Sequence, residues 1–379
     1  MRVGTVREVK NHEYRVGLTP ESVRELTAHG HEVRVESGAG LGIGATDAAY
    51  EAAGGTITAT AADVFGQCEM IVKVKEPQAD ERAQLREGQI LYTYLHLAPD
   101  PEQAADLLKS GVSAIAYETV TGPGAGGGNS LPLLKPMSQV AGRMAIQAGA
   151  TALEKAHGGR GVLLGGVPGV QPARVMVIGG GVVGFNAAQV AVGMGADVTI
   201  LDRDPEALER LGIHFESRAK TRFSNRANIE EMLCQAELVI GAVLVPGAAA
   251  PRLVKRDMLG CMMPGAVMVD VAIDQGGCFE TSRPTTHDNP TFVVDGIVHY
   301  CVGNMPGAVA RTSTYALNNV TLPHALRIAE AADKGDWRQA LRDNPHLANG
   351  LNLHAGRVTY EAVARELGYG WTPVAEVLA

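Results

Sequence analysis

The chain has 379 residues, a length that predicts two or three domains. Its apolar fraction of 46% and charged fraction of 20% are ordinary for a globular protein and exclude disorder over most of the chain. The formal net charge is −8, from 33 basic and 41 acidic residues, and no Lys/Arg-rich tract is present. Since phosphate contacts need clustered positive charge, we predict no nucleic-acid partner.

The cysteines and the apolar segments indicate the compartment. The cysteines are odd in number, widely spaced and without a C-x-x-C pair, so we predict that they are reduced and mostly buried in a cytoplasmic protein. Charges precede any apolar stretch of signal length near the N-terminus, which predicts no secretory signal. The longest uncharged segment, 175–196, contains six glycines, so we predict no membrane partner. The five cysteines are Cys68, Cys234, Cys261, Cys278 and Cys301.

Short apolar runs alternate with amphipathic segments over the first 120 residues. Thr19-Pro20-Glu21 is typical of a helix start, with a hydroxyl N-cap, a proline at the first helical position and an acid in the first turn. Strands separated by helices at this spacing predict a parallel sheet covered on both faces. The predicted strands are 2–6, 31–36, 70–74, 90–94 and 113–117, and further helices are predicted at 47–53 and 101–108.

A glycine-rich segment, 121–129, lies near the first domain boundary and predicts a surface loop. A helix is predicted over 138–157 with Ser138 as its N-cap, and a second βαβ series runs from Arg174 to about Gly303. The last 70 residues are predicted to be helices at 315–332, 337–343 and 360–367 that pack on the first domain. We therefore predict an α/β protein with two doubly wound Rossmann-like domains with parallel sheets. One comprises 1–132 and 311–379, and the other comprises 133–310.

The second series opens with a nucleotide-binding pattern. The strand 175–178 is followed by Gly179, Gly181 and Gly184 in G-x-G-x-x-G spacing, a helix over 186–194, a strand over 198–201 and Asp202. The glycines permit a tight turn, close approach of a pyrophosphate and close helix packing, while the helix N-terminus favours phosphate. A carboxylate at Asp202 would bind ribose hydroxyls and repel a 2′-phosphate. The pattern therefore predicts NAD, although Arg203 leaves NADP open.

Several segments together resemble the alanine dehydrogenase family over essentially the whole chain. Parts of them also resemble the first component of the proton-translocating transhydrogenase, which shares the fold. The resemblance implies reversible oxidative deamination of L-alanine to pyruvate and ammonia with NAD, by a two-domain subunit of a homohexamer. The segments include EYRVGLTPESV, VKVKEP, LHLAPD, YETV, PMSQVAGR, GGVPGVQPARVMVIGGGVVG and VDVAIDQGGCFETSRPTTHDNPTF.

Such a reaction needs a cation for the substrate carboxylate and a group that moves protons. Arg15 and Lys75 follow predicted strands, at the edge where open α/β sheets bind ligands. In the family these positions hold the carboxylate and the carbonyl oxygen of the substrate. His96 also follows a strand, and imidazole exchanges protons near neutral pH. Asp270 and Asp274 compete as the second catalytic group, and the family places its catalytic acid in IDQGG, which selects Asp274 beside His96.

Motif matching alone implies further cofactor contacts. Some relatives bind magnesium through a Glu–His pair in the late helix. In this chain Arg327 stands at one of those two positions, so we predict no metal site. The chain also departs from relatives in the 121–129 insertion, at Ala207 and at Gly303. The implied contacts, which include Asp274 again, are Ser138, Val182, Val183, Ser224, Val243, Leu244, Val271, Ala272, Ile273, Asp274, Arg283, Val302, Gly303, Asn304 and Met305.

Two other functions compete with this one. A transhydrogenase component would need a membrane partner, and a non-catalytic NAD-sensing protein would have lost the substrate-binding residues. The chain has no predicted membrane span and retains Arg15, Lys75 and His96. Activity on glycine or glyoxylate stays open, because the sequence does not define the side-chain pocket.

Overall fold

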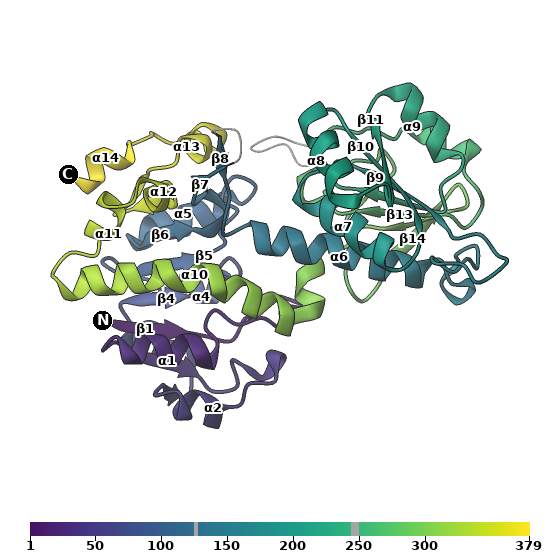
Figure 1. Cartoon of the computed structure of the whole chain (residues 1–379). Helices are drawn as coiled ribbons and strands as arrows, with labels where there is room; N and C mark the ends of the chain where they lie inside the picture. Colours follow the sequence, from purple (N-terminus) through teal and green to yellow (C-terminus); the bar gives the residue numbers. More distant parts are fainter. Residues whose placement is uncertain (125–127, 244–249) are drawn as a thin grey trace. The chain divides into compact units, whose positions relative to one another are not determined.

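The computed structural model describes residues 1–124, 128–243 and 250–379. The chain divides into two compact units, which we call unit 1 (Met1–Met137 with Gly307–Ala379) and unit 2 (Ser138–Pro306). Each unit is built on a largely parallel sheet with helices, so the predicted α/β class with two Rossmann-like domains is confirmed (Figure 1). The sequence predicts boundaries at 132/133 and 310/311, whereas the units divide at 137/138 and 306/307.

Unit 1 contains an eight-stranded sheet in the order β17-β16-β6-β5-β4-β1-β2-β3. The strands from β1 to β6 are parallel, whereas β16 is antiparallel to both β6 and β17. The strands are β1 (Arg2–Thr5), β2 (Glu32–Glu36), β3 (Thr56–Thr58), β4 (Met70–Val72), β5 (Ile90–Thr93), β6 (Ser113–Ala116), β16 (Leu351–His354) and β17 (Arg357–Val358). A separate hairpin joins β7 (Gly122–Pro123) to β8 (Asn129–Ser130).

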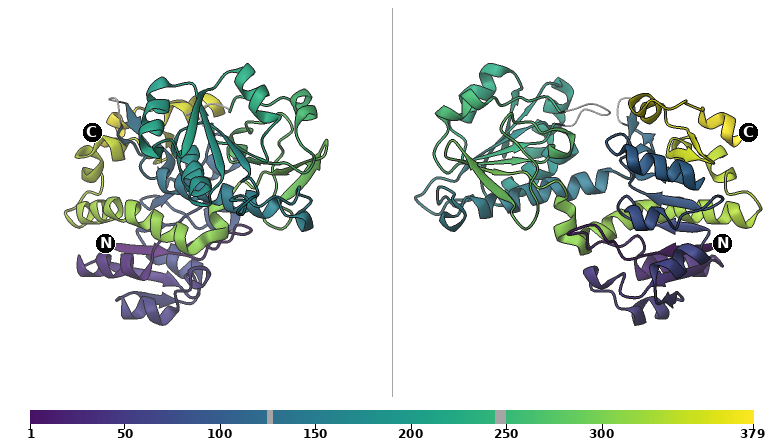
Figure 2. Two further views of the ribbon diagram at one scale, coloured as in Figure 1. Left: turned by 45° about the vertical axis from the view of Figure 1, so that its right-hand side comes forward. Right: turned by 180° about the vertical axis from the view of Figure 1, so that it is seen from behind.

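Helices cover both faces of this sheet. Successive side chains of β5 point to opposite faces, and each face packs against its own set of helices. Leu91 packs with residues of α3, α5 and α13, whereas the Tyr92 hydroxyl donates to the Thr321 carbonyl in α10, at 3.3 Å. Both chain ends belong to this unit (Figure 2). Its helices are α1 (Pro20–Ala28), α2 (Asp47–Ala52), α3 (Ala61–Gln67), α4 (Ala79–Arg82), α5 (Pro101–Ser110), α10 (Ala310–Asp333), α11 (Gln339–Arg342), α12 (Pro345–Ala348), α13 (Glu361–Leu367) and α14 (Val374–Leu378), with 3₁₀ turns η1 (Leu41–Ile43) and η2 (Tyr117–Thr119).

Unit 2 contains a seven-stranded sheet in the order β11-β10-β9-β12-β13-β15-β14, parallel except for the β14–β15 pair. The chain order reverses between β9 and β12, which is where doubly wound sheets bind dinucleotides. The strands are β9 (Arg174–Ile178), β10 (Asp197–Asp202), β11 (Ala219–Phe223), β12 (Leu238–Gly241), β13 (Val267–Asp270), β14 (Thr291–Val294) and β15 (Ile297–Tyr300). The helical segments are α6 (Lys135–Ala152), α7 (Val182–Gly193), α8 (Pro205–Phe215), α9 (Arg226–Leu233), η4 (Lys155–His157), η5 (Arg256–Cys261), η6 (Ile273–Gln275) and η7 (Met305–Val309).

Some element predictions were wrong. Helix α6 begins at Lys135, so Ser138 lies inside the helix and is not its N-cap. The prediction followed the hydroxyl at position 138, but the helix instead starts from the turn at 131–134. The C-terminal residues do return to unit 1, as predicted, but they include β16 and β17 besides helices. Among the described residues, no helix is both long enough and apolar enough to cross a membrane.

The prediction that all five cysteines are reduced was also wrong. Cys234 and Cys261 form a disulfide with their Cα atoms 4.8 Å apart. One follows the last residue of α9 and the other ends η5, and these two elements pack together, so residues separated by 27 positions become neighbours. The other three cysteines are free and buried, as expected, and burial raises the pKa of Cys278 to about 12.

Reducing the Cys234–Cys261 bond should lower the melting temperature of the protein by roughly 5–10 °C. Closing a loop of this length in the unfolded chain contributes ~3.5 kcal/mol in the chain-entropy description. Thermal unfolding with and without a phosphine reductant measures the effect, and Cys234→Ser should show no response to the reductant. Finding five titratable thiols in the unreduced, denatured protein, instead of three, would contradict the pairing.

Candidate active site

The three residues predicted to serve the substrate in unit 1 gather at one sheet edge. Arg15 lies in the segment after β1, Lys75 follows β4 and His96 follows β5, and these strands are neighbours in the order β5-β4-β1. Because the strands are parallel, their carboxyl ends meet at the same edge. The three strand ends that the sequence predicts separately therefore lie in one region of unit 1.

Arg15 is buried against a partner that the sequence analysis missed. Its Nε donates to Glu13 Oε1 at 2.7 Å and its Nη2 donates to Glu13 Oε2 at 2.5 Å, while Nη1 lies 3.1 Å from the Met137 sulfur. Burial lowers the pKa of Arg15, but the Glu13 carboxylate outweighs this effect and raises it above its ordinary value. The two-point pairing fixes the plane of the guanidinium.

The two lysines of VKVKEP lie in different environments. Lys73 has no exposed surface, and its Nζ donates to Glu8 Oε2 at 3.0 Å and to Glu81 Oε1 at 2.7 Å. Burial lowers the pKa of Lys73, but the two carboxylates outweigh it and raise the pKa above its ordinary value. Lys75 has a side chain 16% exposed, with its Nζ 3.9 Å from Glu76. Lys73 is therefore a structural ion-pair partner, whereas the Lys75 side chain is partly exposed.

Glu8 joins the buried lysine to the backbone at the end of β4. Its Oε1 accepts from the Val74 amide at 2.7 Å and from the Lys75 amide at 3.4 Å. Burial raises the pKa of Glu8, against the lowering effect of Lys73. The segment that carries Lys75 is thus tied to the segment after β1, which leads on to Arg15.

His96 has an exposed side chain on a left-handed backbone, with φ of 49°. Its ring stacks on the Tyr94 ring at a centroid distance of 5.9 Å and an interplanar angle of 8°. The Tyr94 hydroxyl donates to the Leu133 carbonyl at 2.6 Å, and burial raises the pKa of Tyr94. The imidazole therefore lies against a fixed aromatic surface at the end of β5.

In unit 2 the glycine turn has the geometry that a dinucleotide needs. Gly179 has φ of 103°, which favours glycine, and a Cβ on Gly184 would lie 1.7 Å from the Gly179 carbonyl oxygen. By contrast, no described atom lies within 4 Å of where a Gly181 Cβ would be, at the N-cap of the 12-residue helix α7. The open position and the helix N-terminus fit a pyrophosphate.

Asp202 ends β10 and holds the glycine turn directly. Its Oδ2 accepts from the Gly180 amide at 2.6 Å, and its Oδ1 accepts from the Asp204 amide at 2.9 Å. The carboxylate is half-buried, so it retains an accessible side. This placement beside the turn is the one expected of an acid that binds ribose hydroxyls.

Most of the other residues implied as cofactor contacts lie in segments that follow strands of the same sheet, whereas Ser138 lies in α6. Val243 follows β12 and packs near Gly179, and the Ser224 amide donates to the Asp202 carbonyl at 2.8 Å. Ser138 lies one turn before Gly142, which packs on α7. Arg283 lies over the Phe292 ring at 4.4 Å. Val182 and Val183 begin α7, the residues 271–273 follow β13, the residues 302–305 follow β15, and Leu244 lies outside the described residues.

The loop that carries Asp274 is held by hydrogen bonds to Asp270, the other carboxylate considered as the second catalytic group. Asp270 has no exposed surface, and its Oδ2 accepts from Ser282 Oγ at 2.6 Å and from the Cys278 amide at 2.8 Å. Burial raises the pKa of Asp270, and these hydrogen bonds oppose the rise. Asp274 lies in η6, where a Cβ on Gly303 would come within 2.5 Å of its Oδ1. Asp270 is thus a structural group, and Gly303 provides the space that the Asp274 carboxylate occupies.

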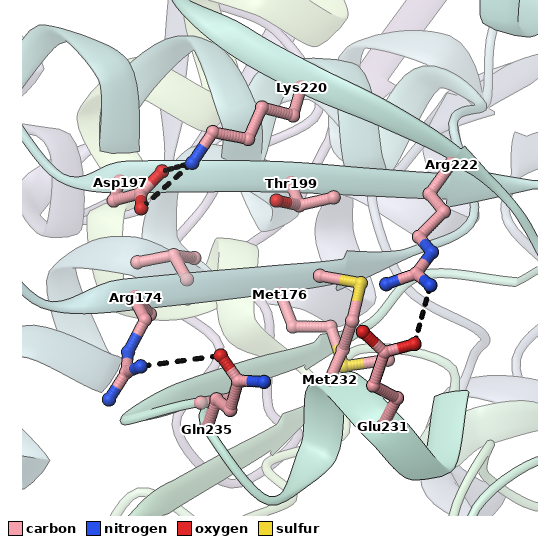
Figure 3. A pocket seen from close by; sticks show the side chains of 11 residues that line it. Arg174, Met176, Asp197, Thr199, Lys220, Arg222, Glu231, Met232 and Gln235 are labelled. Carbon is pink, nitrogen blue, oxygen red and sulfur yellow. Dashed lines mark hydrogen bonds and ion pairs between the residues drawn. The ribbon is translucent and has the colours of Figure 1, made fainter. Parts of the chain in front are cut away.

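A pocket of unit 2 lies away from these residues, as Figure 3 shows. It has a volume of about 220 Å³ and is lined by strands β9 to β11 and by α9. Its charged groups are already paired, with Lys220 Nζ 2.7 Å from Asp197 and Arg222 2.5 Å from Glu231. None of the residues predicted for the site lines it. Among the described residues, no group of three or more His, Cys, Asp or Glu is placed to hold a metal ion.

Comparison with known proteins matches both parts of the chain. Residues 4–141 match the family described as "Alanine dehydrogenase/PNT, N-terminal domain", and residues 145–361 match "Alanine dehydrogenase/PNT, C-terminal domain". The chain belongs to the alanine dehydrogenase/PNT family. The resemblance noted in the sequence is therefore confirmed.

Individual relatives within the family match over their full length. The chain is 58% identical to the alanine dehydrogenase of Halomonas elongata over 378 residues and 54% identical to that of Mycobacterium tuberculosis over 379 residues, with 100% of each chain covered. A solved L-alanine dehydrogenase matches with a TM-score of 0.92 at 49% identity, covering 100% of both chains. The transhydrogenase from Sinorhizobium meliloti matches less closely, with a TM-score of 0.80 at 27% identity over 96% of this chain and 100% of that chain.

Replacing the two neighbouring lysines should separate stability from activity. Lys73→Met leaves Glu8 and Glu81 buried without their cation, which should lower the free energy of unfolding by about 3–5 kcal/mol. Lys75→Met should leave that free energy near the wild-type value and instead reduce kcat/KM for the amino-acid substrate. Urea unfolding and steady-state kinetics of both variants measure the two effects. Equal stability of the two variants would contradict the structural role of Lys73.

Proposed function

We propose that this chain catalyses the reversible oxidative deamination of L-alanine to pyruvate and ammonia with NAD. The observation that carries the proposal is identity above 50% to alanine dehydrogenases over the whole chain, in a protein that retains Arg15, Lys75, His96 and Asp274. The transhydrogenase alternative is less favoured, since the transhydrogenase match is only 27% identical. The NAD-sensing alternative would not require the substrate-binding residues to be retained.

Membership of this family implies a nicotinamide dinucleotide, and the described residues of unit 2 fit one. The N-terminus of α7 and the open position at Gly181 would take the pyrophosphate, and Asp202 would accept hydrogen bonds from the adenosine ribose. A ribose 2′-phosphate would bring negative charge against Asp202, which favours NAD over NADP. When bound, the nicotinamide supplies an acceptor for the hydride that leaves the α-carbon of alanine.

The substrate is held by cations in unit 1. Arg15 is oriented by Glu13 and would bind the carboxylate of alanine with its guanidinium. Lys75 would donate to the carboxylate or to the developing carbonyl oxygen and stabilise negative charge there. Two cations on one small anion would restrict the orientation of the α-carbon, which hydride transfer requires.

Proton transfers are assigned to His96. Once the ammonium of alanine has given up a proton, loss of hydride leaves an iminium, which water attacks while a base takes a proton from the water. The carbinolamine then needs an acid to release ammonia, so one group must act in both directions. Imidazole, with an ordinary pKa of about 6.5, suits both steps at neutral pH better than a carboxyl group near 3.9. Asp274 would balance the charge of the substrate ammonium and iminium. The net reaction is L-alanine, NAD⁺ and water to pyruvate, ammonium, NADH and a proton.

Replacing Asp202 should relax cofactor choice. Asp202→Ala should raise KM for NAD and reduce the preference for NAD over NADP, measured as kcat/KM, by roughly tenfold or more, the size expected from losing about 1.4 kcal/mol. Asp204→Ala is the matched control, because that carboxylate caps α8 and does not contact the glycine turn. A wild-type enzyme that used NADP as well as NAD would refute the argument from Asp202.

Replacing His96 should remove turnover without removing the cofactor. His96→Ala should lower kcat by roughly 10²–10⁴, the usual range for a positioned acid or base, while NADH binding measured by fluorescence stays near wild type. Asp274→Ala should also reduce kcat strongly. His324→Ala is the control, since this histidine lies on α10 and is not assigned to the site. If His96→Ala kept more than about half of kcat at pH 8, His96 would not be the proton-transfer group.

The assembly and location are proposed from the same resemblance. A homohexamer in the cytoplasm is expected, and both remain predictions. Light scattering of the purified protein tests the first, since a mass near that of one subunit, 39.7 kDa, over a wide concentration range would refute it.

A further inference from the structure

The backbone at His96 is held in a conformation that histidine seldom adopts. Its φ of 49° lies in the left-handed region, where residues other than glycine are uncommon and persist when their surroundings hold them. The exposed His96 side chain stacks on Tyr94 but buries little surface of its own. The restraint therefore comes from the backbone of the loop.

One carboxylate accepts hydrogen bonds from two successive backbone amides of this loop. Glu118 Oε1 accepts from the His96 amide at 2.7 Å, and the Leu95 amide lies 3.1 Å from Oε1 and 3.2 Å from Oε2. Successive N–H groups around a left-handed residue form a concave site for an anion. On the other side of the loop, Gln103 Nε2 donates to the Leu95 carbonyl at 2.7 Å.

Glu118 reaches the loop from the next strand of the sheet. It lies in η2, directly after β6, and β6 pairs in parallel with β5, which leads into His96. The carboxylate thus joins the ends of two adjacent strands, and it is half-buried among them. Its oxygens accept hydrogen bonds from backbone amides, so the carboxylate holds the loop in place and does not transfer protons.

We infer that Glu118 is a positioning residue, whose carboxylate fixes the left-handed loop so that the His96 imidazole is presented to the substrate. This inference rests on the proposed function for the role of His96. Without the carboxylate, the two amides lose their acceptor, the loop leaves the left-handed conformation and the imidazole moves away from its place at the end of β5.

The first test is a comparison of kcat with KM. Glu118→Ala should lower kcat by about 10²-fold, the loss that a misplacement of roughly 1 Å causes, with KM for alanine and NADH binding changed much less. Glu118→Gln keeps the volume but loses the charge, and it should lower kcat by about tenfold. Glu87→Ala is the matched control, because this exposed glutamate precedes the opposite end of β5. A kcat within twofold of wild type in either Glu118 variant would overturn the inference.

Chemical rescue separates positioning from general damage to the fold. Formate can enter the space vacated in Glu118→Ala and supply the missing acceptor, so kcat should rise about tenfold and saturate with formate, while chloride has no such effect. Formate should not activate the wild type. A Glu118→Ala enzyme that folds but gains nothing from formate would overturn the inference. If Glu118→Ala does not fold, the kcat of Glu118→Gln decides the matter by the criterion above.

A readout that needs no substrate distinguishes this inference from the proposed function. Diethyl pyrocarbonate modifies exposed imidazoles, and peptide mass spectrometry gives the rate at His96 with exposed His157 as an internal reference. The His96 rate should change severalfold in the Glu118 variants. If that rate changes in a protein that does not oxidise alanine, only the proposed function fails. If alanine is oxidised but neither kcat nor the rate at His96 responds, only the positioning role fails.

Discussion

The loops at the strand ends depend on carboxylates that accept hydrogen bonds from backbone amides. Four of the loops that carry predicted functional groups are held in this way by an acid from a neighbouring segment. A charged acceptor strengthens such a bond, and a loop with satisfied amides can be held without a ligand. The acids are Glu8 for the Lys75 segment, Glu118 for His96, Asp202 for the glycine turn and Asp270 for the Asp274 loop.

The same residue type therefore has two roles in this protein, and burial separates them. Asp270 and Glu8 have almost no exposed surface and a raised pKa, so each serves as an internal support for a loop. Asp202 is half-buried and holds a loop while one side stays accessible. A carboxylate in a strand-end motif can thus be essential without contacting the substrate. Its burial indicates whether it only supports a loop or can also contact a ligand.

Much of the fold was predictable from the sequence, for identifiable reasons. The glycine turn, the strand β9 and the acid at Asp202 follow local rules of spacing, and the N-cap at Thr19 was found with its side chain accepting from the Ser22 amide. The β16–β17 pair was missed because short strands on an antiparallel edge lack the helix-separated pattern. The disulfide was missed because pairing depends on how α9 packs on η5.

The site was only partly predictable, for a related reason. Residue types and strand ends select Arg15, Lys75 and His96, because their chemistry suits the reaction. The residues that hold them are separated by long stretches of chain, as Glu118 is from His96, so no local pattern identifies their roles. Glu13 is the exception, because E-x-R places a carboxylate two residues from the arginine that it pairs with.

The discontinuity of unit 1 affects how the protein is made. Synthesis from the N-terminus produces β1 to β6 first, yet their sheet lacks β16, and one of its faces lacks α10, until the last part of the chain emerges. Unit 2 is contiguous and is complete once residue 306 has been added. Because domains generally fold as units during synthesis, the unit begun second can fold first, and the apolar side chains around Tyr92 stay uncovered on the nascent chain in the meantime. During this interval the exposed apolar surface is most prone to aggregation, and a chaperone would bind it then.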